Sequence, residues 1–229
     1  MSRIAEIGSQ ILSRAERRVE VAAENIANAS TPGFQRRIAF DPLVGEPTAR
    51  DRPVGLDLKP GSLVETGRSL DLALGGAGFF VLQGPEGPIY TRQGAFRREA
   101  DGRVVGANGR PLQIHGGGDL TVASDAVEIL SDGTVLEAGA PVARLEIVTF
   151  AVPAALRPGA EGLSAAPEAE AQRVVQPSIR QGAYEASNVS TGDEMVAIME
   201  ALRRAESGQR LITVYDELMG RALSAFGQA

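Results

Sequence analysis

The residues that could carry chemistry are few, and the first candidates are the glycines of "GGAGFF", residues 75–80. Two of them are spaced like the first glycines of a G-x-G-x-x-G loop, which binds the phosphates of a dinucleotide. Val81 occupies the position of the third glycine, and no Gly-Lys-Ser/Thr sequence lies nearby. We therefore predict no cofactor here. The glycines instead let the backbone of Phe79 and Phe80 approach a core closely where a strand begins.

The only histidine of the chain is His115, which three glycines follow. One histidine in a sequence without cysteine cannot build a transition-metal site, and the lack of cysteine also excludes a catalytic thiol. A Ser-His-Asp triad would need His115 as its base, yet no G-x-S-x-G turn exists to present the serine. We predict a solvated turn histidine, no catalytic residue, no metal site and no small-molecule substrate.

Acidic side chains supply two further candidates. Asp101 and Asp132 each precede a glycine, but a calcium-binding loop needs several oxygen ligands at alternate positions, and each of these stretches has one. We predict that both are turn residues. Glu16, Glu20 and Glu24 are spaced by four and share one face of a helix. Two interpretations of that row stay open: a solvated face, or a polar surface that lines a channel or contacts the arginines of a neighbour.

The composition restricts the class of protein. The chain has 229 residues, of which 43% are hydrophobic, so it can bury a core. Its formal net charge of -6 argues against nucleic-acid binding, which relies on clustered positive charge. No run of about 18 apolar residues is present, and charged residues interrupt the N-terminus from its start. We predict no membrane insertion and no cleaved secretory signal.

The N-terminal segment, residues 1–33, is predicted to be a helix with a firm stop. Between residues 3 and 29 the apolar side chains recur with a helical period and form one stripe: Ile4, Ile7, Ile11, Ala15, Val19, Ala22 and Ile26. Several of them are eleven residues apart, a spacing that gives a nearly straight seam suited to a long partner. Pro32 and Gly33 then end the helix, because proline lacks an amide hydrogen and glycine permits unusual backbone angles.

The middle of the chain follows a different pattern. Residues 34–69 are predicted to be an extended connector. Residues 70–180 are predicted to be a mainly β domain, because short apolar runs alternate there with turn signals. The strongest signals are Asp101-Gly102, Asn108-Gly109 and Asp132-Gly133, since both central residues of a type I′ hairpin turn need positive φ. We expect antiparallel strands joined by these turns.

A second long helix is predicted within residues 181–229. It begins at Ser190 or Thr191, where Asp193 and Glu194 in the first turn favour the helix dipole. Its apolar stripe consists of Ile198, Leu202, Ala205, Ile212, Met219, Leu223 and Phe226. A glycine inside a helix costs about 1 kcal/mol relative to alanine, so we expect a kink or a weak point near Gly208.

These elements predict an α+β fold, in which long N- and C-terminal amphipathic helices pair and a mainly antiparallel β domain is inserted between them. Neither helix has enough sequence around it to form a domain alone, so each stripe needs the other helix or another subunit. We therefore predict an assembly interface formed by Ile4, Ile11, Ala15, Ala22, Ile26, Ile198, Leu202, Ile212, Met219 and Leu223.

Three motifs carry a resemblance to a known family. "ENIANASTPGF", residues 24–34, resembles the N-terminal signature of bacterial flagellar rod and hook proteins. "QGAYEASNVSTGDEMVAIMEALRRAE", residues 181–206, is similar to their C-terminal signature, in which Ser-Asn-Val precedes an amphipathic helix. The block at residues 70–112 is similar to the central part of the proximal and distal rod proteins. The signature turn residues are Asn28, Pro32, Gly33, Phe34, Ser187, Asn188 and Val189.

The resemblance implies a structural subunit of the flagellar basal-body rod, and not an enzyme. In that family the terminal helices pair and pack with those of neighbouring subunits, forming part of the drive shaft for motility. The implied partners are other rod subunits, further copies of the chain and the flagellar type III apparatus, which exports the chain unfolded to the periplasmic rod. The chain length and "NIANASTPGF" favour the proximal rod type. A distal rod protein or a hook-type axial protein is the alternative, and a β-rich sugar-binding protein or hydrolase is a more distant one.

Overall fold

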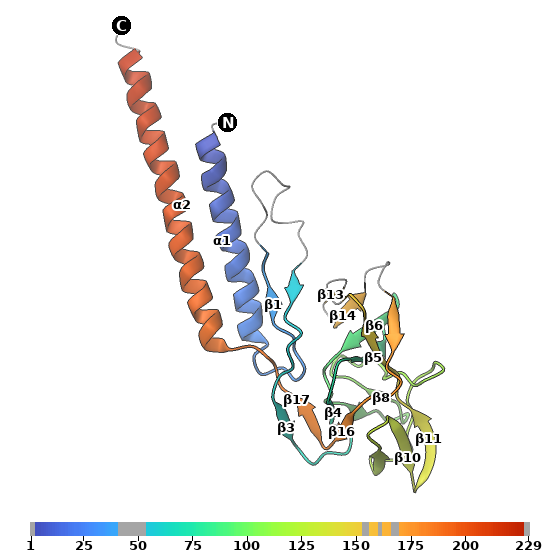
Figure 1. Ribbon diagram of the computed structural model, residues 1–229. Coiled ribbons are helices and arrows are strands. Elements are labelled where there is room, and N and C mark those ends of the chain that lie inside the picture. Colours follow the sequence, from blue (N-terminus) through green and yellow to red (C-terminus); the bar gives the residue numbers. More distant parts are fainter. Residues whose placement is uncertain (1–2, 41–53, 153–155, 160–161, 166–169, 227–229) are drawn as a thin grey trace. The chain divides into compact units, whose positions relative to one another are not determined.

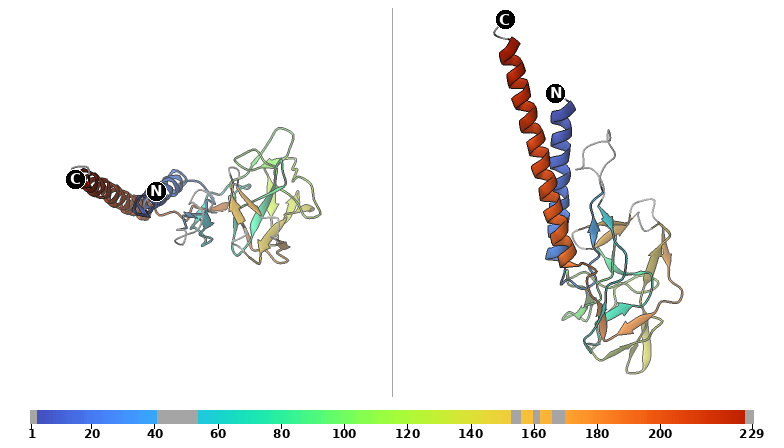
Figure 2. Two further views of the ribbon diagram at one scale, coloured as in Figure 1. Left: turned by 90° about the horizontal axis from the view of Figure 1, so that it is seen from above. Right: turned by 60° about the vertical axis from the view of Figure 1, so that its left-hand side comes forward.

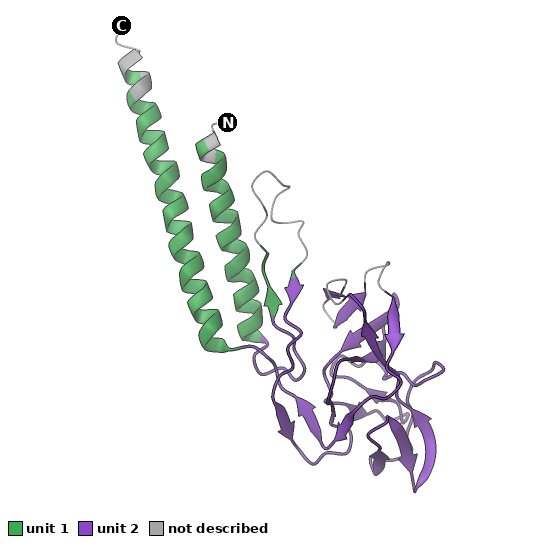
Figure 3. Ribbon diagram, viewed as in Figure 1, with its two compact units in different colours: residues 1–27, 37–54, 190–229 green, residues 28–36, 55–189 purple. Residues whose placement is uncertain are grey.

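The computed structural model describes residues 3–40, 54–152, 156–159, 162–165 and 170–226. The chain divides into two compact units, shown in different colours in Figure 3. The helical unit comprises residues 1–27, 37–54 and 190–229, and the β unit comprises residues 28–36 and 55–189. The segment that follows the first helix therefore belongs to the β unit.

Two long helices form most of the helical unit. Helix α1 (Arg3–Ala27) and helix α2 (Thr191–Phe226) lie side by side and run in opposite directions (Figure 1, Figure 2). The prediction of paired terminal helices is confirmed. The helical unit also contains the short strand β1 (Arg37–Ile38).

The helix ends follow local chemistry. The side-chain oxygen of Ser190 accepts a hydrogen bond from the amide of Asp193 at 3.4 Å, and the Ser190 carbonyl accepts one from the amide of Glu194 at 3.1 Å. These bonds cap α2 at the predicted start. Helix α1 ends at Ala27, before Pro32 and Gly33, and the Thr31 amide then donates a hydrogen bond to the Asn28 carbonyl at 3.0 Å and closes a turn.

The β unit is built from antiparallel strands, as predicted. Its largest sheet has six strands in the order β13 (Leu156–Pro158), β14 (Leu163–Ala165), β6 (Pro88–Thr91), β5 (Phe79–Gln83), β12 (Ile147–Phe150) and β15 (Ala171–Arg173). A three-stranded sheet has the order β11 (Ala140–Arg144), β10 (Thr134–Glu137) and β9 (Val127–Ile129). Three strand pairs are β16 (Ile179–Gln181) with β4 (Leu72–Leu74), β17 (Ala183–Glu185) with β3 (Leu63–Glu65), and β7 (Arg97–Arg98) with β8 (Val104–Val105). Strand β2 (Gly55–Leu56) also lies in this unit.

Strand β5 is the centre of the core. Phe80 and Leu82 belong to one cluster of buried side chains, and Phe79 and Val81 belong to a second. Alternate residues of a strand face opposite sides of its sheet, so β5 is buried on both faces. This explains why its sequence is a continuous apolar run, and it confirms that Phe79 and Phe80 enter a core strand. Phe80 packs edge-on against Phe96, with ring centroids 5.2 Å apart.

The predicted turns are in place, but their predicted type is wrong. Asp101-Gly102 connects β7 to β8, Asp132-Gly133 connects β9 to β10, and Asn108-Gly109 turns the chain after β8. Only the glycine of each pair has positive φ, so none is a type I′ turn. The Asp or Asn side chain instead accepts a hydrogen bond from the amide two residues ahead, at 3.0 to 3.2 Å. These backbone bonds hold the pKa of Asp101 and of Asp132 below the usual value.

A turn with positive φ at both central residues lies elsewhere, at Ala138-Gly139 between β10 and β11. Its φ angles are 49° and 80°, and Glu137 pairs directly with Ala140 across it. Alanine seldom adopts positive φ, so the sequence contains no signal for this turn.

Candidate assembly site

Small residues line the contact between α1 and α2. On α1 the buried small residues Gly8, Ala15 and Ala22 are seven apart, and on α2 the buried Ala201 and Gly208 are also seven apart. A seven-residue repeat keeps one seam facing a partner helix, and small side chains let the two backbones come close. The small buried residues thus repeat every seven positions, whereas the sequence suggested a repeat of eleven.

The two helices approach each other closely at Gly208 and Gly8. A Cβ atom on Gly208 would lie 3.0 Å from Cγ2 of Ile11 and 3.4 Å from the carbonyl oxygen of Gly8. A Cβ atom on Gly8 would lie 2.5 Å from Cγ1 of Ile212. Helix α2 continues without interruption through Gly208, and the kink or weak point expected there stays a prediction. The glycine provides space for α1, and helix packing compensates for its low helix propensity.

The predicted interface residues of α1 differ in their burial. Ala15 and Ala22 are each 2% exposed, and Ile11 and Ile26 are half-buried. Ile4 is 42% exposed. The seam between the helices therefore uses the middle of the predicted stripe fully and its N-terminal end only in part.

The predicted interface residues of α2 also divide. Ile198 and Ile212 are half-buried, whereas Leu202 and Met219 are exposed. Leu223 lies within α2, but its side chain is outside the described residues. The role of all these residues between subunits stays a prediction.

Helix α2 carries apolar side chains that α1 does not cover. Met195, Met199 and Leu202 are more than half exposed and fall on one helix face, which points away from Ala201 and Gly208 of the seam. Further along the helix, Val214 and Leu218 are also more than half exposed. Sequence reasoning missed all of these except Leu202. Contiguous exposed apolar side chains on a folded protein usually mark an interaction surface.

The two signature motifs meet in the β unit, where the Asn188 side chain joins three chain segments. Its carbonyl oxygen accepts a hydrogen bond from the amide of Arg36 at 2.6 Å. Its amide nitrogen donates to the carbonyl oxygens of Asp57 and Lys59, each at 2.8 Å. The Asn188 backbone amide lies 3.4 Å from the carbonyl oxygen of Phe34 and donates to it. The N-terminal and C-terminal signatures, more than 150 residues apart, thus form one structural junction.

Only a glycine fits at position 33 of this junction, because of its backbone conformation and the backbone atoms around it. Its φ is 64°, and a Cβ atom there would lie 2.2 Å from the backbone nitrogen of Gln93 and 2.3 Å from the carbonyl carbon of Arg92. The Gly33 amide donates to the carbonyl oxygen of Glu185 at 2.6 Å. A side chain is therefore excluded both by backbone conformation and by space.

A buried ion pair lies next to Gly33. Arg92 and Glu185 are 7% and 1% exposed, and Nε of Arg92 lies 3.4 Å from Oε2 of Glu185. The other oxygen of Glu185 accepts hydrogen bonds from the Gln35 side chain at 3.3 Å and from the Gly61 amide at 3.0 Å. Burial lowers the pKa of Arg92, and the Glu185 carboxylate opposes that shift. Removal of either charge would leave the other buried and unpaired, which is strongly destabilising.

The remaining signature residues support the two turns. The side-chain oxygen of Asn28 accepts a hydrogen bond from the Thr31 hydroxyl at 3.2 Å, and Pro32 follows directly. The Ser187 hydroxyl oxygen accepts one from the Val189 amide at 3.3 Å. The structure thus gives the signature residues a shared role in positioning the chain that enters and leaves the β unit.

The candidates for catalysis do not converge. His115 lies in an exposed turn, as predicted, and its Nδ1 lies 3.0 Å from Oε2 of Glu146, a partner that the sequence did not indicate. Among the described residues, no group of three His, Cys, Asp or Glu side chains could hold a metal ion. No helix within the described ranges is long and apolar enough to cross a membrane.

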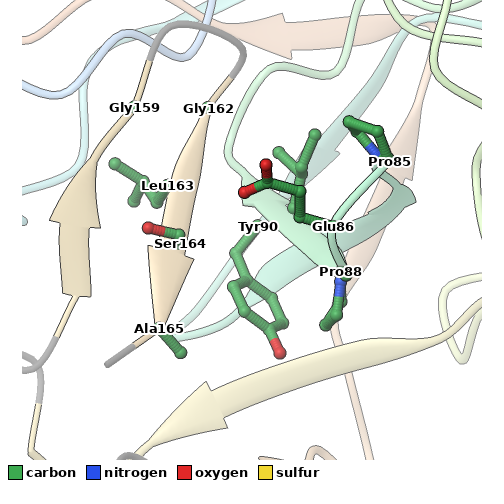
Figure 4. A pocket seen from close by; sticks show the side chains of 11 residues that line it. Pro85, Glu86, Pro88, Tyr90, Gly159, Gly162, Leu163, Ser164 and Ala165 are labelled. Atoms are coloured by element: carbon green, nitrogen blue, oxygen red, sulfur yellow. The ribbon is translucent and has the colours of Figure 1, made fainter. Parts of the chain in front are cut away.

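One groove of the β unit tests the hydrolase alternative. It encloses about 370 Å³ between residues 85–90 on one side and residues 159 and 162–165 on the other, and Figure 4 shows Glu86, Pro88 and Tyr90 on one side of it. Glu86 is the only carboxylic acid among its described lining residues, whereas a typical glycosidase site needs two. Burial raises the pKa of Tyr90.

Comparison with known proteins gives a consistent result along the whole chain. Residues 8–35 match the family model "Flagella basal body rod protein", residues 73–137 match "Flagellar hook protein FlgE/F/G D1 domain", and residues 180–225 match "Flagellar basal body rod FlgEFG protein C-terminal". The flagellar basal-body rod protein FlgF of Salmonella typhimurium is 34% identical over 88% of this chain and 89% of its own length. FlgF of Escherichia coli is 33% identical with the same two coverages. The rod protein FlgG of Agrobacterium fabrum is 30% identical over 87% of this chain and 90% of its own length.

Proposed function

Because the chain belongs to the flagellar basal-body rod protein family, we propose that its paired terminal helices are the part that assembles into the rod. The chain is a structural rod subunit of the FlgF-like kind, close to FlgG, and its place is the flagellar basal body. A family of structural proteins implies no enzymatic role. The finer question is which surface of the subunit contacts the neighbouring subunits.

The observation that carries the proposal is the uncovered apolar face of α2. Met195, Met199 and Leu202 are 58%, 52% and 52% exposed, and burying three such side chains together would be favourable. Pairing with α1 leaves them in solvent, so neighbouring rod subunits are the partners that fit. The interface proposed from the sequence is thereby extended from the seam to this face.

The test replaces two of these side chains with aspartate, in Met199→Asp/Leu202→Asp. Both residues point away from the seam, so α1 and α2 should stay paired and the helical circular dichroism should be unchanged. A charge buried between subunits without a partner costs several kcal/mol, so we expect loss of rods and of swimming when this variant replaces the natural chain. The matched control is Val142→Asp, at an exposed valine of β11 in the β unit, which should assemble normally.

Normal motility of the Met199→Asp/Leu202→Asp strain would refute the proposed interface. Loss of motility with Val142→Asp as well would show that the assay responds to any exposed charge. Ile198→Asp, in the half-buried part of the seam, should differ from both because it unpairs the helices as well.

We also propose export by the flagellar type III apparatus to the periplasmic part of the rod. The family resemblance of both terminal signatures supports this route. Blocking that apparatus should retain the chain in the cytoplasm, which cell fractionation measures, and its continued appearance in the periplasm would contradict the route.

A further inference from the structure

A basic groove runs along the paired helices of the helical unit. It encloses about 370 Å³ and is lined by Ile11, Arg14, Ala15 and Arg18 of α1 and by Arg203, Arg204 and Ser207 of α2. Ala15 is buried and Ile11 is half-buried, whereas Arg203 and Arg204 are exposed. The groove therefore combines an apolar base with a rim of guanidinium groups.

Three of the four arginines that line the groove have no carboxylate partner among the residues that the structure describes. In the part of the chain that the structure describes, Arg14, Arg203 and Arg204 make no ion pair. A guanidinium group stays protonated at any physiological pH. A partner that fits must be anionic, and it must be elongated to follow a groove along two helices.

An acidic row with the matching spacing lies on α1 of the same chain. Glu16, Glu20 and Glu24 follow each other by one helical turn, as Arg14 and Arg18 do in the groove, so each step is about 6 Å. At 3.6 residues per turn the centre of this row lies about 150° around α1 from Ala15 and Ala22 of the seam.

Two carboxylates of the row have partners within the chain. Nη1 of Arg17 lies 2.7 Å from Oε2 of Glu20, and Glu24 pairs with Arg37. Glu20 is well exposed, and an exposed pair of this kind contributes about 0–1 kcal/mol, so exchange for an intersubunit pair is inexpensive. Glu16 is exposed.

We propose that the acidic row of one copy occupies the arginine groove of a second copy. This inference rests on the proposed assembly through the terminal helices and names the surfaces that meet. The groove and the row are different surfaces of the helical unit, so the contact is heterologous: each copy uses its groove on one side and its row on the other. Contacts of this kind repeat into rings or helical assemblies, which is the geometry that a rod needs.

Disulfide cross-linking tests the contact, because the natural chain has no cysteine. Ala23→Cys places a thiol beside the acidic row, and Ser207→Cys places one in the groove. Ile11 packs near Gly208, and Ala23 is twelve residues, or about 18 Å, further along α1. A disulfide needs Cα atoms within about 7 Å, so it can form only between two molecules.

In basal bodies isolated from cells that carry both cysteines, we expect oxidation to give a ladder of cross-linked products, which are dimers and higher multiples of the 24.0 kDa chain. Each single-cysteine variant should give no such ladder. Arg203→Glu/Arg204→Glu should lower the cross-linked fraction by about tenfold or more, as reversal of close interfacial charges does. Adding Glu16→Arg/Glu20→Arg to that chain should restore the ladder. Arg157→Glu, at an exposed arginine of the β unit, is the matched control and should leave it unchanged.

Rods of normal appearance without the ladder would overturn the contact and leave the rod function intact. A cross-linked product that joins the chain to a protein of another mass would also overturn it, because the occupant would then be a different subunit. Charge reversal without effect on the ladder would show that the arginines do not hold the row. A failure of the proposed assembly through the exposed face of α2 would appear instead as normal motility of Met199→Asp/Leu202→Asp.

Discussion

Gly33→Ala is the substitution whose effect follows most directly from the geometry of the signature junction. The change adds one methyl group to a turn at the end of the N-terminal signature, which packs against the backbone of Arg92 and Gln93 within the β unit. Gly33 has a φ of 64°, and the added Cβ would lie 2.2 Å from the nitrogen of Gln93. The obstructing atoms belong to the backbone, so no side-chain rotation can relieve the contact.

The magnitude has two parts. The left-handed conformation costs an alanine about 1–2 kcal/mol. Displacing closely packed backbone costs about 1–3 kcal/mol more, since ordinary contacts to a Cβ begin about 1 Å further away. We therefore expect Gly33→Ala to lower the free energy of unfolding of the β unit by about 2–5 kcal/mol. Gly67→Ala provides the matched control, because Gly67 has a φ of 71° but no heavy atom within 4 Å of the added carbon.

The assay is urea denaturation of the full chain, followed by tyrosine fluorescence. The chain has three tyrosines and no tryptophan, and Tyr215 lies in α2. A Tyr215→Phe background leaves Tyr90 and Tyr184, which both belong to the β unit. The signal then reports the β unit even if the helices unfold separately.

The control should lose about 1–2 kcal/mol, the conformational part alone. Equal losses for Gly33→Ala and Gly67→Ala would refute the reasoning, because they would show that the backbone of Arg92 and Gln93 does not confine this turn.

Further substitutions test the seam, the junction and the unexpected turn. Gly208→Leu should separate the helices at a cost of about 1–3 kcal/mol, measured as a lower thermal midpoint of the helical circular dichroism, whereas Gly220→Leu, with no heavy atom near its Cβ, should not lower it. A midpoint unchanged by Gly208→Leu would argue against the close approach. Asn188→Ala removes three side-chain hydrogen bonds to backbone groups and should cost about 2–3 kcal/mol in urea unfolding, and a loss below about 0.5 kcal/mol would contradict its joining role. Ala138→Asn should raise stability by about 0.5–1 kcal/mol because asparagine tolerates positive φ, and a destabilised variant would count against the assigned turn.

The elements of the fold were predictable where the signal is local. The helical period of the two terminal segments, the cap at Ser190 and the turn residues Asp101 and Asp132 depend on residues a few positions apart. The sequence therefore determined the class, α+β with paired terminal helices, and the antiparallel character of the middle. The flagellar resemblance was likewise legible, because each signature is a short continuous motif.

The tertiary structure decided what depends on contacts between distant residues. Nothing near Gly208 in the sequence shows that Gly8 and Ile11 of the other helix approach it. Local propensity therefore suggested a kink, and it could not show that packing requires a residue without a side chain there. Arg92 and Glu185 form a buried ion pair, but in the sequence each is one charged residue among many, and nothing there indicates that the two meet. Periodicity could locate an apolar stripe on α2, but only the position of α1 decides that Ile198 is half-buried while Met199 stays exposed. Helical period depends on one segment of the sequence, whereas burial depends on the two helices that pack together, so only the fold shows which face of α2 stays exposed.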